Sequence, residues 1–458
     1  MATDDKTVRL GTMPISRLFL RLAVPAVLGQ LRVLLNNVID RAWVGHIGGS
    51  GALALGAVGM SLPILHLFLA VILMLTVGMS TYVSILLGRG ERALAARVSG
   101  SCFGLALAVN VVAAVGTLGF ADQLLLAFGA GAESLPFARS YLTTLAWGMP
   151  FSHSLLMMTL WLNAQGYVSD SVKLNALSVV TNLVLDPVLI FPCGMGVTGA
   201  ALATNLGGIV ALACGLGLMA RNAGFLRFRL ADLVPRRELC MKPMALGLST
   251  LLNVGLESIG LMFLNAGLQK YGGDRAVATV SLFGVPLLIL MNLCLGLSHG
   301  AQPIISYNYG AGRIDRVREV NRRFVLVSFA CSLVLWLVAM VAPRPLWQCF
   351  TSDAALIVYA TGKTRLFFAV LLFGGIQYAH TYVIKFLGQV KVSLFLGVLK
   401  RLVLLLPLIF ALPVLMPHDQ ATAVLLASPL SEAGAFAVTA ICYFRVMRGL
   451  ARKAGESV

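Results

Sequence analysis

The amino-acid sequence predicts an all-α polytopic membrane protein whose twelve transmembrane helices form two pseudo-symmetric six-helix lobes. Of the 458 residues, 59% are hydrophobic and only 12% are charged, whereas about a quarter of the residues of a soluble domain are charged. Apolar runs of the roughly 20 residues that a helix needs to cross a bilayer recur along the chain, without the alternation of a barrel strand. In addition, the second half of the chain repeats residues of the first half at a constant spacing.

Short polar segments separate the apolar runs, which together give twelve expected spans. The N-terminal segment is polar, and the first apolar run is a full span without a small-residue cleavage site, so we expect the first helix to stay as an anchor. The runs cover residues 16–40, 53–87, 99–121, 138–161, 172–191, 196–220, 243–268, 276–309, 324–343, 355–384, 392–415 and 422–444.

The formal net charge of +17 is distributed unevenly between the two ends of these spans. Twenty-five of the 35 Lys and Arg residues lie in the termini and loops of one side, Lys385 among them, and seven lie on the other side. Because loops rich in Lys and Arg stay in the cytoplasm, both termini are expected there. The basic charge thus serves topology and attraction to the headgroups of the lipid bilayer, and no nucleic-acid partner is expected.

An internal repeat supports the two-lobe plan, because segment 78–90 matches segment 300–312 at an offset of 222 residues. Six spans per half is an even number, so both halves enter the membrane in the same orientation, as in transporters built from parallel repeats. The identical pairs at this offset are Gly78 and Gly300, Ser84 and Ser306, Gly88 and Gly310, Gly90 and Gly312, and Gly166 and Gly388.

The repeat also sets the expected domains. These are an N-terminal lobe (1–220), a basic cytoplasmic linker between the lobes (221–242) and a C-terminal lobe (243–458). In transporters of this plan the two bundles rock about a central site. A channel can arise by the same kind of duplication, so the repeat alone leaves that alternative open.

A few carboxylates lie inside the expected spans, where a charged side chain costs about 2.5 kcal/mol or more and normally faces a polar interior. Asp40 and Asp186 lie near the outer ends of the first and fifth spans, at similar depth. Asn182 precedes Asp186 by four residues and therefore shares its helix face. With Thr204 of the sixth span they form an oxygen-rich cluster that suits Na⁺. Alternatively, two close carboxylates cannot both ionise cheaply, so one of them can carry a proton.

Each carboxylate also has a simpler explanation. Asp186 precedes Pro187, and Asp followed by Pro is a common N-cap and first-turn pair of a helix that begins there. Asp40 precedes Arg41, with which it could form an ion pair at the membrane interface. Neither explanation accounts for Asn182 beside Asp186. We therefore favour the cation site, with Pro187 as a bend that opens the helix next to it.

Other polar residues of the spans outline an expected substrate cavity. Glu257 can attract cations there, although the tenth span carries no acidic partner for it. Glu432 is expected at the interface. The basic residues inside spans, Arg32, Lys400 and Arg401, are expected to pair with intramembrane acids or to reach toward the headgroups. The candidate cavity residues are Gln30, Asn36, Glu257, Gln302, Gln377 and Tyr378.

No motif indicates an enzyme. The tripeptide Gly362-Lys363-Thr364 resembles the end of a phosphate-binding loop, but the motif requires a glycine where this chain has Ile357. The six histidines show no metal-ligand spacing, and neither a nucleophile elbow nor an H-E-x-x-H motif occurs. No cofactor and no resident metal ion are expected, so any pumping would draw its energy from an ion gradient.

Three segments carry a family resemblance that extends over essentially the whole chain. They are PAVLGQLRVLLNNVIDRAWVGHIG in the first span, NLVLDPVLIFPCGMGVTGAALAT through the fifth and sixth spans, and GAQPIISYNYGAG at the end of the eighth. With these segments the chain resembles the multidrug and toxic compound extrusion (MATE) family, and the last segment is most similar to the MepA-like bacterial branch. The resemblance implies the MATE (MOP-type) fold.

The resemblance also implies a function: a secondary active antiporter that exports lipophilic, often cationic drugs or toxic compounds in exchange for H⁺ or Na⁺ by alternating access. It implies a location in the bacterial inner (plasma) membrane and small-molecule partners, and we expect a monomer. The family's first-lobe ion site falls on Asp40, Asn182, Asp186 and Thr204, and Glu257 matches the first acid of a second-lobe pair whose other acid is missing here. A lipid-linked oligosaccharide flippase of the same superfamily is the alternative, and it would need a more strongly cationic central cavity.

Overall fold

The computed structural model describes residues 6–45, 51–127, 135–221, 225–351 and 353–453, and within these ranges the regular structure is entirely helical. The chain folds into two compact units. Unit 1 comprises Met1–Gly247 and Gln302–Ala311, and unit 2 comprises Leu248–Ala301 and Gly312–Val458.

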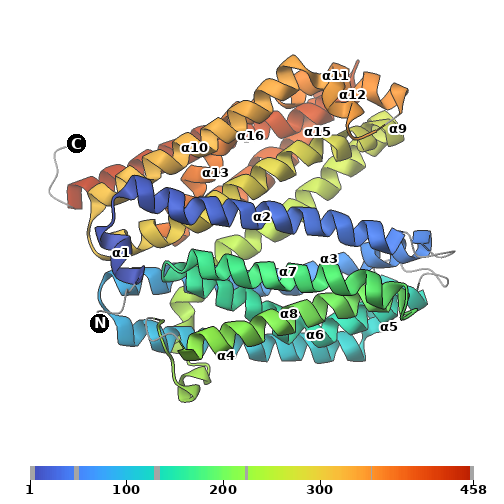
Figure 1. Cartoon of the computed structure of the whole chain (residues 1–458). Helices are drawn as coiled ribbons and strands as arrows, with labels where there is room; N and C mark the ends of the chain where they lie inside the picture. Colours follow the sequence, from blue (N-terminus) through green and yellow to red (C-terminus); the bar gives the residue numbers. More distant parts are fainter. Residues whose placement is uncertain (1–5, 46–50, 128–134, 222–224, 352, 454–458) are drawn as a thin grey trace. The chain divides into compact units, whose positions relative to one another are not determined.

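Unit 1 contains helices α1 to α8, the short 3₁₀ helix η1 and both ends of the long helix α9 (Figure 1). Helix α7 packs between α2 and α8, and α8 also packs against α6. The bounds are α1 (Lys6–Thr12), α2 (Ile15–Gly45), α3 (Gly51–Gly88), α4 (Arg92–Gly119), α5 (Ala121–Ala127), α6 (Leu135–Ala164), α7 (Val168–Ile190), α8 (Gly196–Arg221), η1 (Leu230–Leu233) and α9 (Arg237–Gly310).

Unit 2 contains the middle of α9 and the remaining helices. In this unit α13 packs against α10 and α16, and the π-helical segment η2 packs against α16. The bounds are α10 (Ile314–Val341), α11 (Pro343–Gln348), α12 (Ala354–Phe367), α13 (Leu371–Phe386), α14 (Val390–Val398), η2 (Leu399–Leu405), α15 (Leu406–Leu415) and α16 (Gln420–Lys453).

The twelve expected spans all correspond to helices in the described part of the chain. Nine described helices are long and apolar enough to cross a membrane, and α12 with α13, which meet at a bend of 56°, makes up to ten. Helix α9 holds two of the expected spans, separated at Gly273, where φ is 63° and ψ is −166°. The remaining expected span is helix α6, which is 30 residues long. The predicted all-helical, twelve-span fold is therefore confirmed.

Helix α6 is polar for a span, yet its polar side chains are compatible with a bilayer. The hydroxyl groups of Thr143, Thr144 and Ser154 each donate to a backbone carbonyl one turn earlier, at 2.7, 2.7 and 2.6 Å. A hydroxyl that is hydrogen-bonded within its own helix leaves no unsatisfied donor in a region without water.

The glycines that relate the two halves adopt the same backbone conformation. Gly90 and Gly312 have φ values of 80° and 73°, and Gly166 and Gly388 have φ values of 84° and 71°. Residues with a Cβ atom rarely adopt positive φ, so glycine is the favoured residue at such helix ends. Each of the four glycines is the middle residue of a three-residue connection between consecutive helices. The duplication seen in the sequence is thus visible as a repeated helix-turn-helix connection.

Within unit 1, residues 225–229 of the basic segment after α8 pack on α4 and α6. The Phe228 ring stacks on Phe103 of α4, with centroids 5.3 Å apart, and meets the edge of Trp161 of α6 at 6.0 Å. The backbone N–H of Leu226 donates to Gln165 Oε1 at 2.7 Å. This segment therefore has a defined position on the surface formed by α4 and α6.

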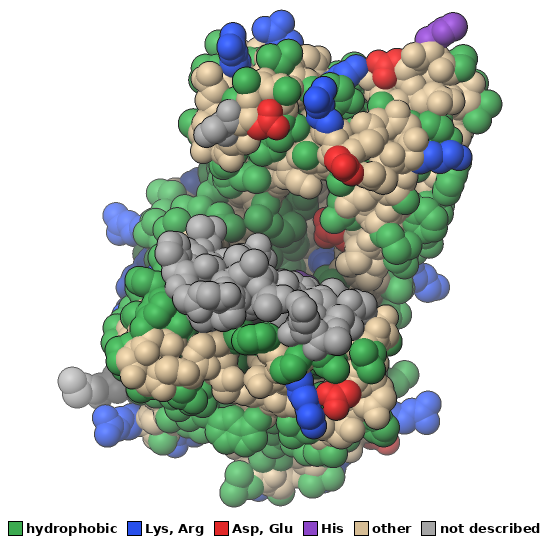
Figure 2. Space-filling view, turned by 90° about the vertical axis from the view of Figure 1, so that its right-hand side faces the viewer, with side chains coloured by type: hydrophobic (Ala, Val, Ile, Leu, Met, Phe, Trp, Pro, Cys, Tyr) green, Lys and Arg blue, Asp and Glu red, His purple; other side chains and the backbone are tan. Residues whose placement is uncertain are grey.

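The surface is rich in apolar side chains, as helices that face lipid tails require. Figure 2 shows hydrophobic side chains spread over much of the face in view. Large residues such as Val112, Phe410 and Ile441 are 72%, 59% and 53% exposed. Exposure on this scale would be unfavourable in water, and it agrees with a multi-pass membrane protein.

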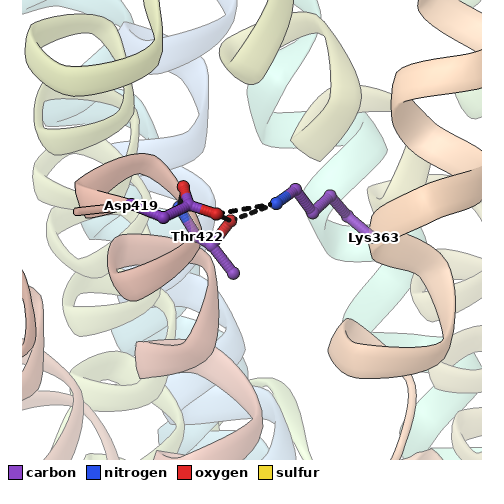
Figure 3. A network of polar contacts seen from close by, with 3 residues as sticks. All are labelled: Lys363, Asp419 and Thr422. Atoms are coloured by element: carbon purple, nitrogen blue, oxygen red, sulfur yellow. Dashed lines mark hydrogen bonds and ion pairs between the residues drawn. The ribbon is translucent and has the colours of Figure 1, made fainter. Parts of the chain in front are cut away.

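In unit 2, a polar network fixes the start of α16 against α12 (Figure 3). Asp419 directly precedes α16: its Oδ1 accepts from the backbone N–H of Thr422 at 3.0 Å, and its Oδ2 accepts from the Thr422 hydroxyl at 2.5 Å. Lys363 Nζ of α12 lies 3.0 Å from the same Oδ2 and also contacts the Thr422 hydroxyl. The hydrogen bond from the Thr422 hydroxyl holds the pKa of Asp419 below its ordinary value. The backbone N–H of Thr422 and the side chain of Lys363 act in the same direction.

Candidate functional site

Asn182 and Asp186 lie one turn apart on α7, and both are buried, at 5% and 1% exposure. Asn182 Nδ2 donates to Asp186 Oδ1 at 3.1 Å. The spacing of four residues places the two side chains on one helix face and so accounts for the contact. The hydrogen bond gives one carboxylate oxygen of Asp186 a partner in a place that water hardly reaches.

Helices α2 and α8 complete a polar cluster around this pair. Asn36 Nδ2 of α2 donates to Asn182 Oδ1 at 3.1 Å, and Asn182 Nδ2 also points to Thr204 Oγ1 of α8 at 3.4 Å. The Thr204 hydroxyl itself donates to the carbonyl of Ala200 at 3.1 Å. Asn182 therefore connects Asp186 with both neighbouring helices, and Asn36, expected in the substrate cavity, is part of this cluster.

Asp40 is the remaining member of the predicted cation site. It lies in α2, four residues after Asn36. Its side chain, like that of Arg41, is outside the described residues. The role of Asp40, and the alternative of an interfacial ion pair with Arg41, stay predictions.

Helix α7 continues through Pro187 to Ile190. Asp186 is therefore an interior residue of this helix and not the N-cap of a helix that begins at Pro187, as the simpler explanation required. Pro187 lies in the last turn of α7, next to the cluster, and the backbone N–H of Phe191 donates to its carbonyl at 3.2 Å.

The other candidate cavity residues are divided between the two units. Gln302 is 4% exposed, and its Nε2 donates to Ser80 Oγ at 2.8 Å where α9 packs on α3 in unit 1. Gln30 is half-buried in α2. Glu257, Gln377 and Tyr378 line a single cavity in unit 2.

This unit 2 cavity has a volume of about 230 Å³ and lies among α9, α13, α14, η2 and α16. Tyr378, Tyr382, Met291 and Leu396 contribute apolar or aromatic walls. The charged residues that line it are Glu257, Lys385, Lys400, Arg401 and Glu432.

Two ion pairs cross the cavity from the consecutive residues Lys400 and Arg401 of η2. Arg401 Nη2 lies 2.9 Å from Glu257 Oε1 of α9, and Lys400 Nζ lies 2.5 Å from Glu432 Oε1 of α16. Neighbouring residues of a helix point in different directions, so one helical turn can bind two other helices. The expectation that Lys400 and Arg401 pair with intramembrane acids is confirmed.

The structure adds to two sequence-based placements in this region. Glu432 lines the cavity and pairs with Lys400, and its expected position at the membrane interface stays a prediction. Lys385, which the charge distribution assigns to a cytoplasmic loop, lies in the last turn of α13 and faces the same cavity. Its Nζ lies 5.8 Å from the centre of the Tyr382 ring.

A polar stripe on α13 is the signal that could have placed Lys385 in the cavity, beside Gln377 and Tyr378, which the sequence predicts there. Four polar residues follow Gln377 at intervals of one, four, five and eight residues, which places them along one side of the helix, and Lys385 is the last of them. All five of these residues line the cavity, and the series is Gln377, Tyr378, Thr381, Tyr382 and Lys385.

Comparison with known proteins places both halves of the chain in one family model, MatE, which matches residues 25–188 and 250–411. The multidrug export protein MepA of Staphylococcus aureus (strain N315) is 24% identical over 411 residues, which is 89% of each chain. MepA of Staphylococcus haemolyticus (strain JCSC1435) is 27% identical over 414 residues, again 89% of each chain.

Solved structures show the same fold. An outward-facing multidrug resistance MATE family transporter of the MOP superfamily matches with a TM-score of 0.89 and 21% identity, over 98% of this chain and 99% of that one. A MOP superfamily transporter from Pyrococcus furiosus matches with a TM-score of 0.88 and 21% identity, with the same coverage of both chains.

Proposed function

Because the chain belongs to the MatE family, whose members are transporters, we propose that it is a secondary active antiporter that exports lipophilic, often cationic drugs or toxic compounds in exchange for H⁺ or Na⁺ by alternating access. The multidrug exporters among its relatives support this substrate class. We further propose that residues 1–220 and 243–458 act as the two moving lobes, that the linker 221–242 joins them, and that the protein works as a monomer.

The polar cluster around Asp186 carries this proposal. A carboxylate in a membrane-spanning helix costs about 2.5 kcal/mol or more, so it is retained where it has a function. Asp186 is 1% exposed and is bonded to Asn182, which in turn contacts α2 and α8. Binding of a cation at Asp186 changes the hydrogen bonds that Asn182 makes to both helices. Ion occupancy and helix packing are thereby linked, as coupling requires.

The proposed ion site consists of Asp40, Asn182, Asp186 and Thr204. In the arrangement described, the amide nitrogen of Asn182 faces Asp186 and Thr204, and its oxygen faces Asn36. Na⁺ binds oxygen ligands, so Asn182 would have to turn its amide to join a Na⁺ site. A proton on Asp186 needs no such rotation, and this favours H⁺ between the two coupling ions.

We propose the bacterial inner membrane as the location, with both termini in the cytoplasm. The excess of Lys and Arg in loops of one side supports this orientation.

Transport in proteoliposomes tests the function. Purified protein is reconstituted, a cationic dye is loaded, and efflux is followed under an imposed pH gradient, an imposed Na⁺ gradient, or neither. We expect efflux only with a gradient, and its loss in Asp186→Asn and in Asp40→Asn. Asp170→Asn, at the start of the same helix as Asp186, is the control that should retain transport. Full gradient-driven efflux in both Asp186→Asn and Asp40→Asn, with normal insertion, would refute the ion site.

A further inference from the structure

The charges that line the unit 2 cavity are not those of a site for cations. Two carboxylates and three cationic side chains face it, so one positive charge is in excess. Both carboxylates are already paired, Glu257 with Arg401 at 2.9 Å and Glu432 with Lys400 at 2.5 Å. A cationic ligand would have to displace one of these internal cations, whereas an anionic ligand would not.

Lys385 provides the charge in excess. It is half-buried in the last turn of α13, and its Nζ lies 5.8 Å from the centre of the Tyr382 ring. Among the residues that the structure describes, none forms an ion pair with Lys385. A half-buried cation without a counter-ion is less favourable than a paired one, so an anion in the cavity would find a partner in Lys385.

The rest of the cavity wall suits a small ligand with an aromatic or apolar body. Tyr378 and Tyr382 supply ring faces, and Gln377, Thr381 and Asn253 supply hydrogen-bonding groups. The volume of about 230 Å³ is somewhat below the roughly 300–1,000 Å³ of sites for drug-sized ligands. The space therefore fits one or two fused rings with a single polar group.

We propose that this cavity binds a small monoanionic ligand, a carboxylate attached to an aromatic or apolar body, with Lys385 as its counter-ion. Arg401 and Lys400 stay engaged with their own carboxylates. The proposal goes beyond the export function, because it concerns what unit 2 binds at equilibrium and needs no ion gradient. Failure of antiport and failure of this site are therefore separable.

Equilibrium dialysis with three probes of matched shape tests the charge preference. The probes are naphthoate, which is anionic, naphthamide, which is neutral, and naphthyl-trimethylammonium, which is cationic. The full-length protein in nanodiscs is compared with empty nanodiscs. We expect naphthoate to bind about tenfold more tightly than naphthamide, as charge-assisted hydrogen bonds allow.

Variants then assign the preference to Lys385. In Lys385→Gln the advantage of naphthoate over naphthamide should disappear, and in Lys385→Arg it should remain. Glu257→Gln frees Arg401 and should tighten naphthoate binding. Lys391→Gln, on the exposed face of α14, is the control that should change nothing.

Three results would overturn the proposal. They are equal binding of naphthoate and naphthamide, a preference that survives in Lys385→Gln, and a preference for the cationic probe that is lost in Glu257→Gln. Thermal melting of each variant checks folding. If Lys385→Gln does not fold, Glu257→Gln still decides the question. In this variant naphthoate should bind more tightly and the cationic probe should bind more weakly.

Discussion

Gln302 donates a hydrogen bond to Ser80, its own counterpart one repeat earlier in the chain: Nε2 and Oγ are 2.8 Å apart, and the residues are separated by 222 positions. Gly88 and Gly310 are related by the same offset, and they meet in the same way. A Cβ atom on Gly88 would lie 1.9 Å from the Tyr307 carbonyl oxygen, and one on Gly310 would lie 2.1 Å from that of Ile85. The contact between the ends of α3 and α9 is thus self-complementary, like an interface across a two-fold axis.

This close approach predicts that alanine is not tolerated at Gly88 or Gly310. Because the atom that a new methyl group would meet is a backbone carbonyl, the two helices must separate. We expect each substitution to cost about 1–3 kcal/mol, as overpacking does, and to lower the melting temperature in detergent. Gly116→Ala, in α4 with no neighbouring atom within 4 Å of its Cβ, should melt like the wild type. Wild-type melting of Gly88→Ala would show that the helices are farther apart.

Asn182 is predicted to be as important for transport as the carboxylate that it supports. Asn182→Ala removes the donor to Asp186 and the contacts with Asn36 and Thr204. Since hydrogen bonds to charged groups are worth about 1.5–3 kcal/mol, gradient-driven efflux should fall at least about tenfold.

The matched control for this loss is Asn292→Ala, because Asn292 bonds only to the carbonyl of Leu288 in its own helix, at 2.8 Å, among the hydrogen bonds of the described residues. Efflux by this variant should be unchanged. Equal efflux by the two variants would remove Asn182 from the proposed mechanism.

The features that sequence reasoning predicted well are local. Helix spans follow from apolar runs of neighbouring residues, and the correspondence of Gly90 with Gly312 follows from the repeat, although their positive φ appears only in the structure. The contact between Asn182 and Asp186 is likewise fixed by a spacing of four residues.

The unit 2 cavity was harder to predict because its contacts join distant helices. For Glu257 we looked for an acidic partner in the tenth span, whereas its partner is Arg401, 144 residues later in the chain. A lysine at the end of an apolar run, such as Lys385, has the same local sequence whether it faces a cavity or the cytoplasm. Only the packing of α13 against its neighbours distinguishes the two.

Acid should weaken the junction between α12 and α16. The pKa of Asp419 is lowered in the folded protein, first by the Thr422 hydroxyl and also by Lys363. A lowered pKa stabilises the fold above the ordinary value of about 3.9, and this stabilisation is lost as the pH falls through the folded-state pKa. Asp419→Asn should therefore reduce the melting temperature at neutral pH more than at about pH 3.

This substitution isolates the charge, because asparagine also caps helices well. The expected effect at neutral pH is small, about 0.2–1 kcal/mol, since the side chain of Asp419 is 51% exposed. Thr422→Val, which removes the hydroxyl donor, should show the same pH dependence. A loss that is equal at both pH values would contradict the assignment to the ionised carboxylate.

The ion pair between Lys400 and Glu432 should contribute more to stability than the pair between Arg401 and Glu257. The side chains of Lys400 and Glu432 are 17% and 34% exposed, whereas that of Glu257 is 53% exposed, so water screens the second pair more strongly. Lys400→Met leaves Glu432 without its cation and should cost about 1–3 kcal/mol, less than the roughly 3–5 kcal/mol of a fully buried pair. The double variant Lys400→Met with Glu432→Gln should recover most of this loss.

A double-mutant cycle on thermal unfolding measures the coupling energy between Lys400 and Glu432, and the same cycle on Arg401 and Glu257 should give a smaller value. Equal coupling energies would show that exposure does not determine the strength of these pairs.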